Sequence, residues 1–83
     1  MKILYFAAFR ERLNRAEEEV SPPAAVQTVG ALIDWLAEQD EAAHFAFSDR
    51  RLVRTALDGR MVAHTAPLTG ANVVALMPPM TGG

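Results

Sequence analysis

The sequence predicts an α+β domain in which a mixed sheet of about four to five strands carries one main helix on one face. Residues 3–9 and 73–77 are apolar at both alternating sets of positions, as in strands that are covered on both sides. Residues 29–39 form the clearest stretch with helical periodicity. With 83 residues, 51% of them hydrophobic, the chain suits one small globular domain.

The first part of the chain is expected to contribute two strands. Residues 3–9 predict the first strand, and 10–14 a short helical turn that leads onward. Residues 16–20 include three consecutive glutamates, and such charges favour an exposed edge strand because they discourage pairing with other sheets. Ser21, Pro22 and Pro23 then interrupt the regular structure.

The main helix is predicted from Val29 to about Gln39, with Thr28 as its N-cap. Its apolar stripe follows the spacing i, i+3, i+4 and i+7 and consists of Val29, Leu32, Ile33 and Leu36. Trp35 lies on the flank of this stripe, where we expect it to cover the edge of the sheet.

The second half of the chain predicts a hairpin and a final strand. Residues 40–48 suggest a short helix, and Asp58-Gly59 between residues 52–57 and 60–62 is typical of a tight hairpin turn. After a turn at Pro67 to Gly70, residues 73–77 predict the last strand. The first and last strands are the most apolar, so we expect them to be neighbours at the centre of the sheet. One helix covers one face, and the other face should therefore keep an apolar patch for a partner.

Composition excludes several kinds of chemistry. The chain has no cysteine, a formal charge of −2 and five scattered glycines, which argues against thiolate metal sites, nucleic-acid binding and a phosphate loop. His44 and His64 lack neighbouring ligands, and the group Arg50, Arg51 and Arg54 is interpreted as solvated charge. No run approaches the roughly 18 apolar residues that span a bilayer. We therefore expect a cytoplasmic protein with no metal site, no membrane contact and no catalytic groups of its own.

The C-terminal sequence MPPMTGG suggests a body at residues 1–77 and an extended tail at 78–83. Pro78 and Pro79 fix their φ angles and end strand pairing, so the tail should leave the body as a stiff arm. Fully extended, it reaches roughly 20 Å. Gly82 and Gly83 lack Cβ atoms, which lets them enter a narrow channel and exposes the terminal carbonyl to attack. A frayed end is the alternative interpretation.

Three motifs carry a resemblance to a known family. They are FAAFRE at residues 6–11, PLTG at 67–70 and PPMTGG at 78–83. With them the chain resembles, over essentially its whole length, the small subunit of molybdopterin synthase, a ubiquitin-like β-grasp sulfur carrier. The terminal diglycine alone is shared with ubiquitin and with thiazole-synthesis carriers, and the proline pair and the opening motif make the likeness more specific.

The resemblance implies a reaction cycle and a set of partners. A ubiquitin-activating-type enzyme would use ATP and magnesium to adenylate Gly83, and a sulfur donor would convert the adenylate to a thiocarboxylate. The tail residues Pro78, Pro79, Met80, Thr81 and Gly82 would insert into the synthase large subunit, in a heterotetramer. There the sulfur would pass to a cyclic pyranopterin monophosphate and build the dithiolene of molybdopterin. The chain would bind no stable cofactor, and the expected apolar docking contacts are Phe6, Phe9, Leu76 and Met77.

Other functions remain open at this point. The chain can be a sulfur carrier for thiazole or cysteine synthesis, which changes only the acceptor of the sulfur. It can also be a ubiquitin-like modifier that is joined through Gly83 to lysines of target proteins. A third alternative is an interaction domain whose tail has no role.

Overall fold

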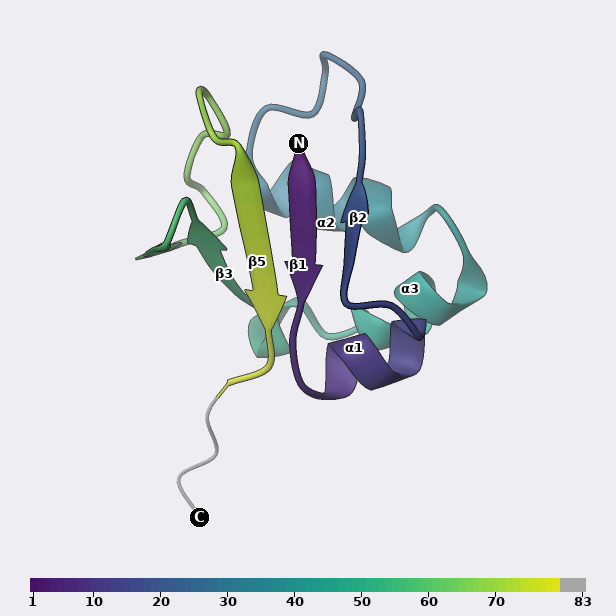
Figure 1. Cartoon of the computed structure of the whole chain (residues 1–83). Coiled ribbons are helices and arrows are strands. Elements are labelled where there is room, and N and C mark those ends of the chain that lie inside the picture. The colour runs from purple at the N-terminus through teal and green to yellow at the C-terminus, as the bar shows by residue number, and fades with distance from the viewer. Residues whose placement is uncertain (80–83) are drawn as a thin grey trace.

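The computed structural model describes residues 1–79, which form a five-stranded sheet with helices packed against it (Figure 1). In chain order the elements are β1 (Lys2–Tyr5), α1 (Ala8–Leu13), β2 (Glu17–Glu19), α2 (Val29–Ala37), α3 (Glu41–Ala46), the short 3-10 helix η1 (Arg50–Leu52), β3 (Arg54–Leu57), β4 (Arg60–Val62) and β5 (Val73–Met77). The α+β class with a mixed sheet is as predicted.

The sheet has the order β2-β1-β5-β3-β4, so the first and last strands lie side by side near its centre. β1 and β5 run parallel, with Lys2 opposite Val73 and Tyr5 opposite Leu76. The other neighbouring strands pair antiparallel. β2 forms one edge, as its three glutamates predicted, and the central pairing of the two apolar strands is confirmed.

The first strand is shorter than its apolar run. β1 ends at Tyr5, and a turn from Phe6 to Phe9 leads into α1, with the Phe9 amide donating to the Phe6 carbonyl at 3.2 Å. Ala7 in this turn has φ 52° and ψ −129°, the conformation of the second residue of a type II′ turn, which glycine usually occupies. The predicted strand at residues 3–9 was therefore wrong beyond Tyr5, because an apolar run does not distinguish a strand from a buried helix.

The main helix begins where the sequence indicated. The Thr28 hydroxyl accepts a hydrogen bond from the Ala31 amide at 3.2 Å and caps the first turn of α2. The predicted apolar stripe of α2 is fully buried, and the helix lies behind the sheet in Figure 1. α3 is capped in the same way by Asp40, whose carboxylate accepts from the Ala43 amide at 2.7 Å.

The predicted hairpin joins β3 and β4 through Asp58 and Gly59, which both have positive φ angles, 47° and 86°. Such a pair is typical of a type I′ turn and sets Leu57 opposite Arg60. The Asp58 carboxylate also accepts from the amides of Asn72 and Val73, at 3.1 and 2.9 Å. The turn therefore fastens the start of β5.

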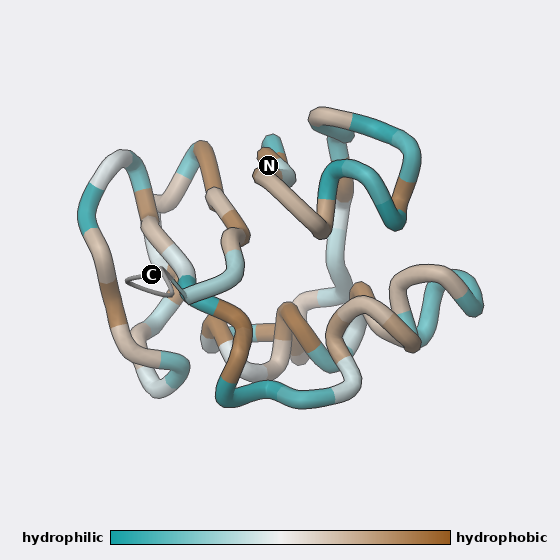
Figure 2. The backbone as a smooth tube through the Cα atoms, turned by 90° about the horizontal axis from the view of Figure 1, so that it is seen from below, coloured by the Kyte–Doolittle hydropathy of each residue, from teal (hydrophilic) through white to brown (hydrophobic). Residues whose placement is uncertain are grey.

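The core lies between one face of the sheet and the three α-helices. Phe47, which follows α3, is fully buried, with ring centroids 6.3 Å from Tyr5 and 5.1 Å from Phe9. α1 and α3 add their own buried side chains to this core, so three helices rather than one cover this face. Seen from below, many of the apolar segments lie toward the middle of the molecule, some lie at its rim, and the hydrophilic segments lie mainly on outer loops (Figure 2).

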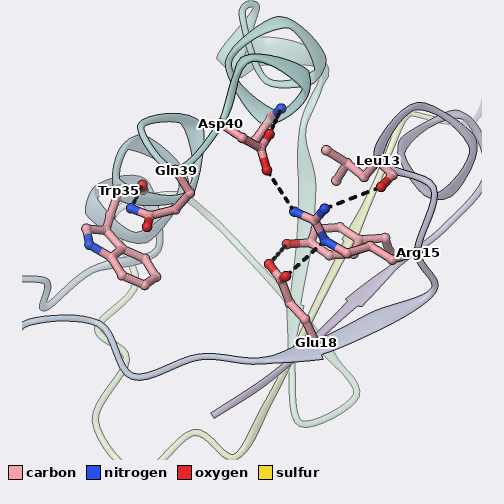
Figure 3. Close-up of polar contacts among 8 residues, drawn as sticks. Leu13, Arg15, Glu18, Trp35, Gln39 and Asp40 are labelled. Carbon is pink, nitrogen blue, oxygen red and sulfur yellow. Dashed lines mark hydrogen bonds and ion pairs between the residues drawn. The ribbon is translucent and has the colours of Figure 1, made fainter.

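A polar network joins α1, β2 and α3 on the flank of this core (Figure 3). Arg15 forms ion pairs with Glu18 at 2.9 Å and Asp40 at 3.4 Å, and donates a hydrogen bond to the Leu13 carbonyl at 3.3 Å. Its guanidinium also lies 5.6 Å from the ring centroid of Tyr5. The network therefore ties the two short helices to the sheet near the C-terminal end of β1.

Candidate functional site

The tail begins at the centre of the sheet. β5 is paired with β1 as far as Leu76 and with β3 as far as Met77, and the half-buried Pro78 and Pro79 follow directly. The first residues of the tail therefore follow a strand that has a neighbour on each side. The predicted tail residues Met80, Thr81 and Gly82, and Gly83, whose carboxylate was predicted to react, lie outside the described residues.

The face of the sheet that points away from the helices carries an apolar row. Strand register places Leu4 beside Ala75, Ala75 beside Ala56 and Ala56 beside Met61. These positions alternate with the core-facing Val74 and Leu76, so their side chains point to the opposite side. We call this surface, with its neighbours Phe6 and Met77, the open face. It is the apolar patch that the sequence predicted.

Two of the predicted docking residues lie on the open face. Phe6 is 46% exposed, and its amide donates to the Leu76 carbonyl at 3.1 Å, which places it next to the end of β5. Met77 is half-buried and is the last residue of β5 before the prolines. Both residues can therefore contact a partner that approaches the root of the tail.

The other two predicted docking residues, Phe9 and Leu76, belong to the core. Phe9 is 4% exposed and packs edge-on against Phe47, while Leu76 is completely buried. The expectation that they are exposed docking contacts is corrected, because both side chains are packed in the core: Leu76 is inaccessible from the surface, and only a small part of Phe9 is exposed. Leu76 alternates with Met77, and Phe9 lies on α1 after the chain has turned.

Met61 is a candidate docking residue that the sequence analysis missed. It is 57% exposed on β4 and ends the apolar row of the open face. The Asp58-Gly59 turn in the sequence could have been used to predict the position of Met61. A two-residue hairpin loop fixes the pairing of the strands, and therefore places Met61 opposite Ala56 and on the same face.

Charged side chains border the open face on both sides. At the β2 edge, Lys2 pairs with Glu17 at 3.1 Å, next to the exposed Glu19. On the other side Arg54 lies opposite Met77, and within residues 1–79 it takes part in no ion pair. A partner for this face should therefore be apolar in the middle, with a carboxylate near the root of the tail.

The structure of residues 1–79 shows how the histidines and the clustered arginines are placed. No group of three histidine, cysteine, aspartate or glutamate side chains in residues 1–79 is arranged to hold a metal ion. His64 donates from Nε2 to the Val53 carbonyl at 2.6 Å, and His44 lies exposed at the end of α3. Arg50 pairs with Asp34 at 2.9 Å and Arg51 with Asp49 at 3.0 Å, so two of the three clustered arginines are engaged within the protein. None of the helices formed by residues 1–79 has the length and apolar character needed to cross a bilayer.

Comparison with known proteins agrees with the fold and with the motifs. The model of the ThiS family matches residues 3–83. The molybdopterin synthase sulfur carrier subunit of Escherichia coli is 36% identical over 83 residues, which cover 100% of this chain and 99% of the relative. The predicted resemblance to the small subunit of molybdopterin synthase is thereby confirmed.

Solved structures of similar proteins share the architecture. A protein of Pyrococcus furiosus, provisionally named molybdopterin converting factor, subunit 1, superimposes with a TM-score of 0.72 and 30% identity over 95% of each chain. SAMP1 of Haloferax volcanii gives a TM-score of 0.73 at 24% identity and covers 100% of this chain and 98% of its own, which shows the common ubiquitin-like β-grasp fold. From its sequence and its fold together, the chain belongs to the ThiS family.

Proposed function

We propose that the chain is a sulfur carrier that serves as the small subunit of a molybdopterin synthase. The observation that carries this proposal is the 36% identity, over 83 residues, with the sulfur carrier subunit of Escherichia coli. The family model also extends through Gly83, so it includes the diglycine. An open apolar face beside a tail that starts at the sheet centre supports a domain that works by docking to other proteins.

The reaction proposed for Gly83 proceeds in two steps on partner enzymes. On a ubiquitin-activating-type enzyme, which supplies ATP and magnesium, the Gly83 carboxylate attacks the α-phosphorus of ATP and pyrophosphate leaves. Hydrosulfide from a sulfur donor then attacks the carbonyl carbon, AMP leaves, and a thiocarboxylate remains. Glycine suits both steps because it has no Cβ to block the approach to the carbonyl.

The body of the domain positions this terminus and does not react. Pro78 and Pro79 keep the start of the tail extended, and Met80, Thr81 and Gly82 follow it into the large subunit. Phe6, Met61 and Met77 on the open face supply the apolar contact that holds the two subunits together. The expected assembly is a heterotetramer, in which the sulfur passes to a cyclic pyranopterin monophosphate and builds its dithiolene.

Intact-mass spectrometry tests the carrier chemistry directly. The purified chain, incubated with its activating enzyme, ATP, magnesium and sulfide, should gain the mass of one oxygen-to-sulfur exchange. A variant that lacks Gly82 and Gly83 should gain none, and a variant extended by one residue beyond Gly83 should be inactive with an unchanged melting temperature. If the unmodified chain shows no gain where a known carrier does, the proposal fails.

Two alternative functions differ from this proposal in the molecule that accepts the sulfur or the activated Gly83. Restoration of molybdenum-enzyme activity in a strain without its own small subunit would distinguish this function from thiazole or cysteine synthesis. A ubiquitin-like modifier would instead leave stable isopeptide-linked conjugates through Gly83 in cell extracts. At 24% identity the likeness to SAMP1 shows the fold alone and does not favour this second function.

A further inference from the structure

A groove of about 380 Å³ lies beside the root of the tail, on the helix side of the sheet. Pro78 and Pro79 line it, together with residues of α1, of the end of α3 and of η1. It is therefore separate from the open face, on which Phe6 and Met61 are exposed. Since the first two tail residues help to form it, a protein that takes up the tail must come close to this groove.

The groove has a firm apolar floor and an exposed apolar wall. Phe9 and Ala46 line it and are 4% and 7% exposed, so the core holds them in place. Leu52 also lines the groove but is 52% exposed at the end of η1. Leu52 therefore continues the apolar lining of Phe9, Ala46, Pro78 and Pro79, and a contiguous apolar surface of this kind is typical of a contact with another protein.

The free charge at this groove is positive. Asp49 also lines it, but its carboxylate accepts two hydrogen bonds from the Arg51 guanidinium, at 3.1 and 3.0 Å. These bonds lower the pKa of Asp49 and keep its charge compensated. Arg12 lines the groove as well, and within residues 1–79 no hydrogen bond or ion pair engages its guanidinium. A partner that fits this groove should therefore present an apolar side chain with a carboxylate next to it.

We propose that this groove receives an apolar side chain, flanked by a carboxylate, from the synthase large subunit as that subunit encloses the tail. This inference rests on the proposed function. The four residues after Pro79 span at most roughly 13 Å when extended, so an active site that reaches Gly83 brings its entrance close to the walls of the groove. The large subunit then contacts the domain on both sides of Pro78 and Pro79, at the open face and at this groove.

Two variants of the full chain test the groove against matched controls. Leu52→Asn should weaken binding to the purified large subunit of the same organism about tenfold, measured by isothermal titration calorimetry. Arg12→Glu should weaken this binding roughly three- to tenfold, and the loss of affinity should be smaller at high salt. Arg12→Lys keeps the positive charge and should therefore keep most of the affinity of the original chain. Phe45→Asn, at a residue 76% exposed on α3, and Arg60→Glu, at the hairpin end of β4, should bind within about twofold of the original chain.

The outcomes separate this inference from the function on which it rests. If the unmodified chain accepts sulfur and binds the large subunit, but all variants bind equally well, the groove proposal is overturned and the carrier function stands. If Leu52→Asn and Arg12→Glu slow only the adenylation of Gly83, the groove serves the activating enzyme and this proposal is wrong. A chain that neither gains sulfur nor binds the large subunit overturns both. Melting curves of all variants verify that the domain remains folded.

Discussion

The Tyr5 hydroxyl donates a hydrogen bond to the Glu18 carboxylate at 2.7 Å and so links the buried side of β1 to the edge strand β2. Tyr5 itself is only 2% exposed. The pKa of the phenol is raised well above its ordinary value, and burial is the largest cause. The hydrogen bond to Glu18 and the negative charge of Glu18 raise the pKa further. The folded state therefore favours the neutral phenol of Tyr5 over the phenolate.

The first prediction is that stability falls with rising pH above about 10, the ordinary pKa of tyrosine. In that range the unfolded chain loses the Tyr5 proton while the folded chain keeps it, so the free energy of unfolding decreases as pH rises. Below pH 10 both states are protonated and this contribution is constant. The chain has a single tyrosine, so absorbance at 295 nm should show ionisation near pH 10 in urea but only at higher pH in the native protein.

Tyr5→Phe is the control for this pH dependence. It should lose about 1–2 kcal/mol of stability at neutral pH, because the hydrogen bond to a carboxylate is removed while Glu18 keeps its ion pair with Arg15. Its stability should then fall less steeply above pH 10 than that of the original chain. Equal slopes would contradict the assignment of this effect to Tyr5.

The second prediction concerns the strained turn before α1. Ala7 has φ 52° and ψ −129°, where its Cβ atom is disfavoured, and such a residue costs on the order of 1–3 kcal/mol. Ala7→Gly should therefore raise the free energy of unfolding by about 1 kcal/mol in a urea titration, after the entropy cost of glycine is subtracted. Ala8→Gly, within α1, should be destabilising instead. A loss of stability in both variants would show that Ala7 is not strained.

The third prediction concerns a hydroxyl in the core. Thr55 is 1% exposed in β3, opposite Leu76, and its Oγ1 has no hydrogen-bond partner among the residues that the structure describes. Thr55→Val keeps the shape and removes an unpaired polar atom, so it should stabilise the domain by about 1 kcal/mol in thermal unfolding. Thr55→Ser, which keeps the hydroxyl and removes the methyl group, should be destabilised by about 1 kcal/mol. The reverse order would indicate that the hydroxyl is satisfied.

The fourth prediction tests the open face. Met61 is 57% exposed, so Met61→Ser should leave the melting temperature nearly unchanged. Loss of its apolar contact should nonetheless weaken binding to the large subunit about tenfold. Phe45→Ser removes an even more exposed apolar side chain from α3, away from this face, and should bind normally. If the two variants bind equally well, the open face is not the docking surface.

Much of the fold could be predicted from local patterns. Thr28 and the stripe from Val29 to Leu36 set the main helix, and Asp58-Gly59 set the hairpin, because these signals act between residues close in sequence. The start of α1 could not be predicted in this way. Residues 6–9 are apolar throughout, and their path depends on the unusual backbone of Ala7 and on the buried ring of Phe47, which comes from a distant part of the chain.

The candidate site, like the fold, could be predicted from the sequence only in part. That an apolar patch lies on the uncovered face follows from two doubly apolar strands and a shortage of helix. Which side chains form it depends on register, and the alternation of Leu76 with Met77 decides which of the two is exposed. The groove beside Pro78 could not be predicted, because residues from α1, α3 and η1 meet there only through tertiary packing.

The position of β5 between β1 and β3 has a consequence for biosynthesis. β5 is the last strand of this sheet along the chain, so during translation β1 and β3 have no common neighbour until residues 73–77 have left the ribosome. The domain should therefore fold after synthesis rather than in stages, and a product that stops before Val73 should remain unfolded and be degraded. Quality control of this kind would leave few truncated molecules that are folded yet lack β5 and the residues that follow it.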